Sequence, residues 1–89
     1  MTNATLFTQP GCGGCIFAAK DLTKAGVQFT ERNVRVDEAA AATVQELYRE
    51  HRDPGVVPET PVIVIDGQVF FGAVELHAYL RELRREAAA

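Results

Sequence analysis

The chain has 89 residues, of which 47% are hydrophobic and 24% are charged. This length suits one small core, so we expect a single domain spanning residues 1–89. A net charge of −3 gives no general attraction to nucleic acid or to anionic lipid, and neither is expected as a partner. No run approaches the roughly 20 apolar residues of a membrane span, and Met1-Thr2-Asn3-Ala4 carries no export signal. We therefore expect a cytoplasmic monomer that does not associate with membranes.

Residues 4–8 predict a short strand, which Gln9-Pro10-Gly11 ends. A helix is expected to begin at the cysteine motif that follows and to end near Gly26. Its buried stripe should consist of residues that recur at three- and four-residue spacing, namely Cys15, Ala18, Ala19 and Leu22. This stripe places Cys12 at the open end of the helix and Cys15 one turn deeper.

Residues 27–34 predict a strand at the edge of a sheet, because charged side chains interrupt its interior. Asp37 is predicted to cap a second helix, whose inner face would carry Val44, Leu47, Tyr48 and His51. That helix closes at Asp53-Pro54-Gly55, and a loop bounded by prolines leads to Pro61. The sequence assigns no role to the part of this loop over residues 51–59.

Residues 62–65 form a continuous β-branched run, which is typical of a central strand covered on both faces. Asp66-Gly67 predicts a tight hairpin into residues 68–71, and the final helix has an inner stripe of Leu76, Tyr79, Leu80 and Leu83. The order β-α-β-α-β-β-α predicts an α/β fold with a four-stranded mixed sheet flanked by helices. Right-handed crossovers would make the first three strands parallel, and the hairpin makes the last two antiparallel.

Both cysteines lie in one tetrapeptide, Cys12-Gly13-Gly14-Cys15. A bridge across so short a loop stabilises a fold little, so a structural disulfide does not explain the pair. Thiol–disulfide exchange does, because it needs one exposed thiolate to attack a substrate sulfur and a second thiol to resolve the mixed disulfide. A helix start lowers the pKa of a cysteine placed there. We therefore predict two catalytic residues, with Cys12 attacking and Cys15 resolving.

Other interpretations of the polar and aromatic residues stay open. A zinc site usually needs four protein ligands, and no second cysteine pair or paired histidine motif exists, so no metal site is predicted. His51 and His77 are interpreted as surface or partly packed helix residues. Gly13 and Gly14 either allow a substrate to approach closely or merely ease the turn. The aromatic pair Phe70-Phe71 either fills the core or helps to dock a protein.

The cysteine tetrapeptide after a strand is followed by Thr60-Pro61-Val62-Ile63-Val64-Ile65-Asp66-Gly67 and then by Phe71-Gly72. This series resembles the glutaredoxin family of the thioredoxin fold, from Ala4 to about Leu83. The resemblance implies a dithiol oxidoreductase that reduces disulfide-containing proteins or glutathione-mixed disulfides, binds no resident cofactor, and takes electrons from glutathione or from thioredoxin reductase. The alternatives are an iron–sulfur cluster carrier and a non-catalytic thioredoxin-like binding module.

The resemblance also implies the substrate-binding residues. Pro61 is expected to be a cis proline beside the cysteines, and the backbone of Thr60 to pair with an extended substrate. Gln9 stands where glutathione-using relatives commonly carry a lysine, which removes a positive partner for a glutathione carboxylate. Their Gly-Gly and acidic pair near the last helix is reduced here to Gly72 and Glu75. The candidate substrate-binding residues are Gln9, Thr60, Pro61, Ala73 and Val74.

Overall fold

The structure is a computed structural model that describes residues 3–88, so Met1, Thr2 and Ala89 lie outside its described part. The predicted domain limits and the absence of an export signal over the first residues therefore stay predictions. The elements follow the predicted order. They are β1 (Asn3–Thr8), α1 (Gly13–Lys24), β2 (Gln28–Asn33), α2 (Glu38–His51), β3 (Val62–Ile65), β4 (Gln68–Phe71) and α3 (Ala73–Ala88). None of these helices is long and apolar enough to cross a membrane.

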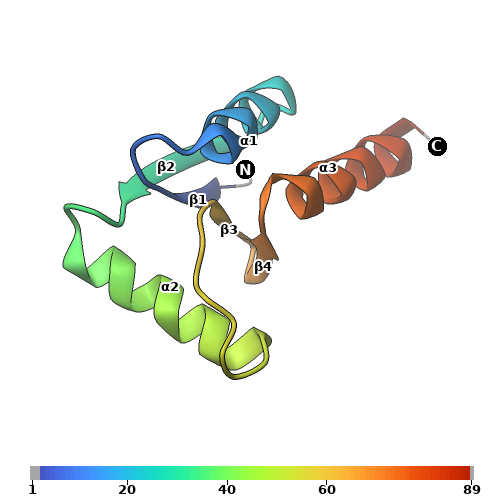
Figure 1. Cartoon of the computed structure of the whole chain (residues 1–89). Coiled ribbons are helices and arrows are strands. Elements are labelled where there is room, and N and C mark those ends of the chain that lie inside the picture. The colour runs from blue at the N-terminus through green and yellow to red at the C-terminus, as the bar shows by residue number, and fades with distance from the viewer. Residues whose placement is uncertain (1–2, 89) are drawn as a thin grey trace.

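The four strands form one mixed sheet in the order β2-β1-β3-β4 (Figure 1). β1 and β2 are parallel, whereas β3 is antiparallel to both β1 and β4. The predictions of an edge position for β2 and a central position for β3 are confirmed. Charged residues in β2 are tolerated because this strand has a neighbour on only one side.

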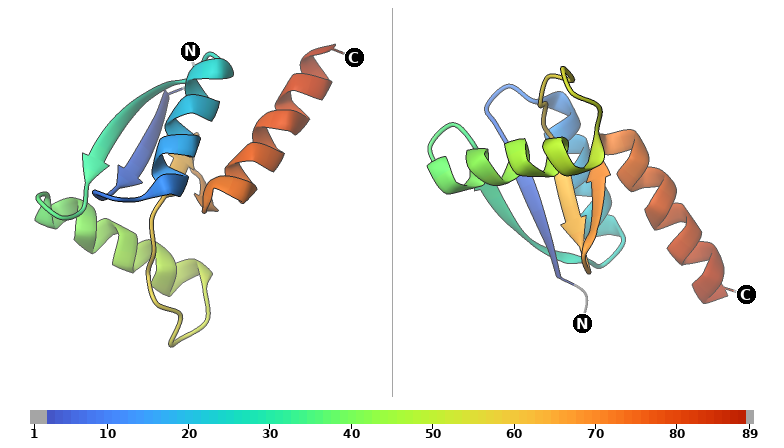
Figure 2. Two further views of the ribbon diagram at one scale, coloured as in Figure 1. Left: turned by 45° about the horizontal axis from the view of Figure 1, so that its top comes forward. Right: turned by 90° about the horizontal axis from the view of Figure 1, so that it is seen from below.

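The prediction that the first three strands are parallel is wrong, because β3 runs antiparallel to β1. β2 ends beside the end of β1, and β3 begins at that same end, where Val62 lies opposite Phe7. A parallel crossover needs the connecting helix to carry the chain back along the strands. Figure 2 shows that α2 instead lies across the strands, so residues 52–61 enter β3 from the end that β2 left.

Helices cover both faces of the sheet, with α1 and α3 on one face and α2 on the other (Figure 2). Side chains alternate along β1, so that Leu6 packs under α1 and α3 while Phe7 packs under α2. The first core contains Ala4, Leu6, Ala18, Leu22, Ile63, Ile65, Leu76 and Leu80. The second contains Phe7, Ala40, Val44 and Val62.

The aromatic pair at the end of β4 divides between these two cores. Phe70 packs against Tyr79 of α3, with ring centroids 4.5 Å apart, and Phe71 packs against Tyr48 of α2 at 4.7 Å. Neighbouring residues of a strand point to opposite faces, so Phe70 contacts α3 on one face of the sheet and Phe71 contacts α2 on the other. Of the two interpretations of Phe70-Phe71, core filling is therefore confirmed.

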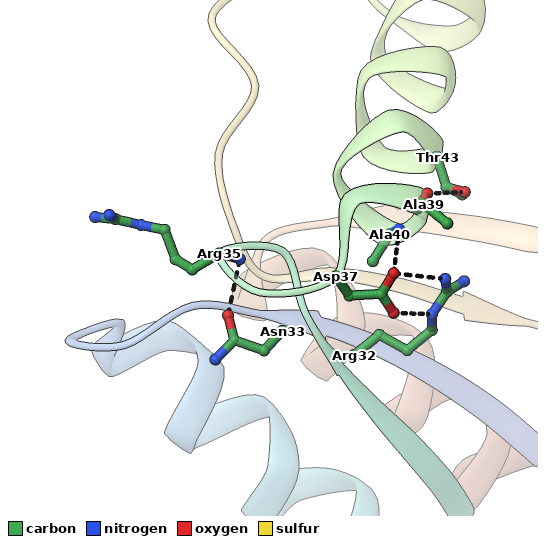
Figure 3. Close-up of polar contacts among 7 residues, drawn as sticks. All are labelled: Arg32, Asn33, Arg35, Asp37, Ala39, Ala40 and Thr43. Atoms are coloured by element: carbon green, nitrogen blue, oxygen red, sulfur yellow. Dashed lines mark hydrogen bonds and ion pairs between the residues drawn. The ribbon is translucent and has the colours of Figure 1, made fainter.

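Asp37 caps α2 as predicted (Figure 3). Its Oδ1 accepts a hydrogen bond from the backbone N–H of Ala40 at 3.0 Å, and Arg32 donates to both carboxylate oxygens at 3.2 and 3.4 Å. The N–H of Ala40 and then the guanidinium of Arg32 hold the pKa of Asp37 below its ordinary value. This network fixes the junction between β2 and α2, on the sheet face away from α1.

Candidate active site

Cys12 is the N-cap residue of α1, and its extended backbone (φ −93°, ψ 101°) precedes the first helical residue. Its Sγ accepts a hydrogen bond from the backbone N–H of Cys15 at 3.0 Å. The unpaired N–H groups and the positive end of the helix dipole both favour negative charge at this position. No acidic side chain lies in the first turn to oppose that effect. The start of α1 therefore directs hydrogen-bond donors toward the sulfur of Cys12.

Cys12 and Cys15 are joined by a disulfide, and their Cα atoms lie 5.2 Å apart. Cys15 is only 5% exposed and belongs to the buried stripe of α1, whereas Cys12 is partly exposed. The predicted stripe is confirmed for Cys15, Ala18 and Leu22, while Ala19 is partly buried. A disulfide approaching from solvent thus reaches Cys12 before Cys15.

Pro61 lies directly beside the cysteine motif, and the predicted cis peptide bond between Thr60 and Pro61 is present. A Cβ added at Gly14 would lie 3.2 Å from Pro61 Cδ, whereas one added at Gly13 would meet nothing within 4 Å. Close packing against the chain's own proline is therefore a reason for glycine at position 14 that the sequence did not reveal. The open surface at Gly13 remains compatible with close approach by a substrate.

Thr60 precedes β3 and lies outside the hydrogen-bonded ladder of the sheet. Among residues 3–88, no hydrogen bond engages its backbone N–H or C=O, and its buried Oγ1 also lacks a partner. The adjoining Pro61 C=O accepts a hydrogen bond from the N–H of Gly72 at 3.0 Å, which ties this segment to the start of α3. The free backbone groups at Thr60 are suited to pairing with an extended chain.

On one side of the disulfide lies a depression of about 270 Å³, here named the polar depression. It is lined by Thr8, Gln9, Pro10, Gly11, Cys12, Cys15, Ile16, Glu31 and Asn33. Gln9 Oε1 also accepts a hydrogen bond from Arg35 Nε at 3.4 Å. Arg35 thus brings a positive charge beside Gln9, at the position where the resemblance lacked one. The predicted parallel pairing of β1 and β2 could have indicated the contact between Gln9 and Arg35, since it brings the segments after both strands together.

On the other side lies a depression of about 390 Å³ between the starts of α1 and α3, here named the apolar depression. It is lined by Gly13, Gly14, Phe17, Ala73, Val74 and His77. Phe17 is 53% exposed and Val74 is 83% exposed, although both are large hydrophobic residues. Ala73 and Val74 therefore do lie beside the cysteine motif, but on the side opposite to Gln9. The sequence analysis did not predict that Phe17 and His77 lie beside Ala73 and Val74.

Glu75 is the acid that remains near the start of α3, and both of its oxygens are engaged within the protein. Oε1 accepts a hydrogen bond from the N–H of Phe71 at 3.1 Å, and Oε2 accepts one from Arg52 at 2.9 Å. The guanidinium of Arg52 also stacks over the Phe71 ring, 4.2 Å from its centroid. Arg52 thereby gives the start of the 51–59 segment a structural role, which is to join the end of α2 to α3.

The two histidines, which the sequence analysis treated alike, differ in the structure. His51 is exposed at the end of α2, and its ring lies 6.1 Å from that of Phe71. His77 Nδ1 lies 2.9 Å from Oδ2 of Asp21, a buried residue of α1. Within residues 3–88, no group of three or more His, Cys, Asp or Glu residues is placed to hold a metal ion.

The sheet order, with α1 following β1 and carrying the cysteine pair at its start, is that of a thioredoxin-fold protein. The family model described as Glutaredoxin matches residues 4–70. This match covers most of the chain, which therefore belongs to the glutaredoxin family.

Solved structures agree with this assignment. A thioredoxin-like protein is 29% identical, with a TM-score of 0.70, over 86% of this chain and 97% of its own. Glutaredoxin from Brucella melitensis is 26% identical, with a TM-score of 0.69, over 98% of this chain and 87% of its own. NrdH-redoxin from Escherichia coli is 25% identical, with a TM-score of 0.60, over 80% of this chain and 83% of its own. It is described as a glutaredoxin-like protein with a thioredoxin-like activity profile. No curated protein matches this chain significantly.

Proposed function

We propose that this protein is a thiol–disulfide oxidoreductase that reduces disulfides of other proteins by a dithiol mechanism. The observation that carries the proposal is the unequal environment of the two cysteines. Cys12 is partly exposed at the N-cap of α1, with its Sγ accepting a hydrogen bond from the N–H of Cys15, while Cys15 is buried one turn deeper. This arrangement supplies one reactive thiolate and one sheltered thiol.

The reaction proceeds in two exchanges. The Cys12 thiolate attacks one sulfur of the substrate disulfide, whose S–S bond breaks as a mixed disulfide forms, and the leaving thiolate takes a proton from water. Cys15 then loses its proton and attacks Cys12 Sγ, which releases the second substrate thiolate to be protonated in turn. The substrate has gained two electrons, and the enzyme is left with the Cys12–Cys15 disulfide.

We further propose that thioredoxin reductase supplies the electrons that reopen this disulfide. Three observations support a protein donor: Glu75 is engaged by Phe71 and Arg52, exposed apolar residues flank the motif, and the similar NrdH-redoxin has a thioredoxin-like activity profile. Glutathione is the second candidate, as donor or as part of a mixed-disulfide substrate, and the Arg35 charge beside Gln9 favours it. We place the reaction in the cytoplasm, where reductants keep such pairs in the dithiol form.

A comparison of electron donors tests the proposal. The same disulfide substrate is offered with NADPH and thioredoxin reductase, or with NADPH, glutathione and glutathione reductase, and NADPH consumption is followed. We expect sustained turnover with thioredoxin reductase that exceeds turnover with glutathione. Faster turnover with glutathione would overturn the choice of donor. An absence of turnover with both donors, together with failure of the chemically reduced protein to reduce the substrate, would overturn the oxidoreductase itself.

A further inference from the structure

Asp21 is a charged residue in an apolar core. It is 7% exposed, and it lies on α1 beside Leu22, which is fully buried. A buried carboxylate is costly unless a hydrogen-bond donor or a positive charge satisfies it. His77 of α3 fills this need, because its Nδ1 lies 2.9 Å from Asp21 Oδ2. The pair therefore ties α3 to α1 and fixes the orientation of the His77 ring.

The contact with Asp21 also determines whether the other ring nitrogen of His77, Nε2, donates or accepts a hydrogen bond. A carboxylate only accepts, so the Nδ1 of His77 carries the hydrogen. In the neutral ring Nε2 is then an acceptor, and among residues 3–88 no hydrogen bond engages it. His77 is exposed and lines the apolar depression. Of the residues that line the depression, only His77 carries a polar atom in its side chain.

The walls around this acceptor are apolar. Phe17 packs edge-on against the His77 ring with centroids 6.0 Å apart, and Val74 and Ala73 line the opposite wall from α3. Gly13 and Gly14, the two residues between the cysteines, complete the lining of the depression. A protein whose disulfide reaches Cys12 from this side covers the surface that Gly13 and Gly14 share with Phe17 and Val74. Glutathione has no apolar side chain to fill it.

We propose that the apolar depression binds an aromatic side chain with a polar tip, tyrosine above all, that lies beside the reactive disulfide of the protein substrate. The ring would pack between Phe17 and Val74, and its O–H would donate to His77 Nε2. Such a side chain satisfies both the apolar walls and the single acceptor, whereas phenylalanine or leucine satisfies only the walls. This inference rests on the proposed function, since the occupant belongs to the substrate.

Three short peptides test the inference. Each is closed by one disulfide and differs only at the residue beside a cysteine, which is tyrosine, phenylalanine or serine. The pre-reduced protein is mixed with each peptide, and single-turnover rate constants are measured by acid quenching, which needs no electron donor. We expect the tyrosine peptide to react about five-fold faster than the phenylalanine peptide, from one added hydrogen bond, and the serine peptide to be slowest.

Variants assign the preference to His77. His77→Phe keeps a ring against Phe17 but removes Nε2, so the tyrosine and phenylalanine peptides should react at equal rates. The matched control, His51→Phe, changes the other histidine and should keep the five-fold difference. Because His77→Phe leaves the Asp21 carboxylate unpaired, a double variant with Asp21→Leu provides the same test in a fully apolar setting. Asp21→Asn still accepts from Nδ1 and should keep the preference for tyrosine.

The outcomes separate this inference from the proposed function. If none of the peptide disulfides is reduced, the proposed function fails and this inference fails with it. Equal rates for all three peptides would overturn the inference alone. A preference for tyrosine that survives His77→Phe in the single and double variants would also overturn it, because the acceptor would then lie elsewhere.

Discussion

The two depressions that flank the disulfide differ in origin and in chemistry. The polar depression takes Gln9 from the end of β1 and Glu31 and Asn33 from the edge strand β2. The apolar depression takes Phe17 from α1 and Val74 from α3, so two helix starts build it. The polar depression contains Cys12 and Cys15, and the apolar depression contains the two glycines between them. Under the proposed function, we expect small charged thiols to approach from the polar side and protein side chains from the apolar side.

The largest effect is expected when the shared nucleophile is removed. Cys12→Ser should reduce turnover of protein disulfides and of glutathione-mixed disulfides to background, because both reactions need this sulfur as the nucleophile. Cys15→Ser should lose turnover of protein disulfides but retain a monothiol reaction on glutathione-mixed disulfides. Steady-state assays on both substrate classes measure these effects. Full activity of Cys12→Ser would contradict the assignment of Cys12 as the nucleophile for both substrate classes.

A charge in the apolar depression should separate the two substrate classes. Val74→Asp should lower kcat/KM for insulin about tenfold more than kcat/KM for the small substrate hydroxyethyl disulfide, because only the protein must desolvate the new carboxylate. Val57→Asp is the matched control, since Val57 is also exposed but lies in the loop before Pro61. An equal loss for both substrates would show that the depression does not distinguish them.

A smaller effect is expected on the polar side. Arg35→Gln removes the positive charge beside Gln9 and should raise the KM for glutathione about threefold in the assay with glutathione reductase. The KM of the unaltered protein should also rise with salt, and that of the variant should rise less. Lys24→Gln, at the far end of α1, provides a matched loss of charge. A KM that responds equally to both variants would contradict a local role for Arg35.

The smallest effect is expected at the cap of α2. The pKa of Asp37 is lowered in the folded state, so its carboxylate stabilises the fold above its ordinary pKa of 3.8, and this stabilisation is lost as pH falls through the lowered value. Asp37→Asn still caps the helix but lacks this charge. The Tm difference between the two proteins should therefore be largest near neutral pH and shrink in acid. A difference that grows as the pH falls would contradict the assignment.

Local patterns predicted most of the fold. The apolar periodicity of each helix, the Asp66-Gly67 hairpin and the Asp37 cap depend on neighbours within a few residues, and the structure confirms the hairpin and the cap. The predicted inner faces of α2 and α3 are wrong at their last residues, because His51 and Leu83 lie beyond the part of each helix that packs on the sheet and are exposed. The direction of β3 was not predictable in this way. It depends on the direction in which α2 crosses the sheet, which follows from the packing of residues far apart in the sequence, such as Phe71 against Tyr48.

The candidate site was predictable only in part. The cysteine pair is contained in four residues, and the cis proline followed from the family resemblance. The contact between Arg35 and Gln9 joins residues 26 apart, and that between His77 and Asp21 joins residues 56 apart. Neither contact has a local pattern, because each exists only once two elements pack together. Asp21, an acid next to the apolar stripe of α1, was a signal for the second contact that the sequence analysis did not use.

The most direct test of the account is to trap the mixed disulfide. The reduced Cys15→Ser and Cys12→Ser variants are each mixed with a protein disulfide substrate, quenched in acid and examined by mass spectrometry without reduction. The account predicts that Cys15→Ser accumulates a covalent adduct through Cys12, whereas Cys12→Ser accumulates none on the same timescale. An adduct that forms on Cys15 of the Cys12→Ser variant as fast as on Cys12 would contradict the division of roles between the two cysteines.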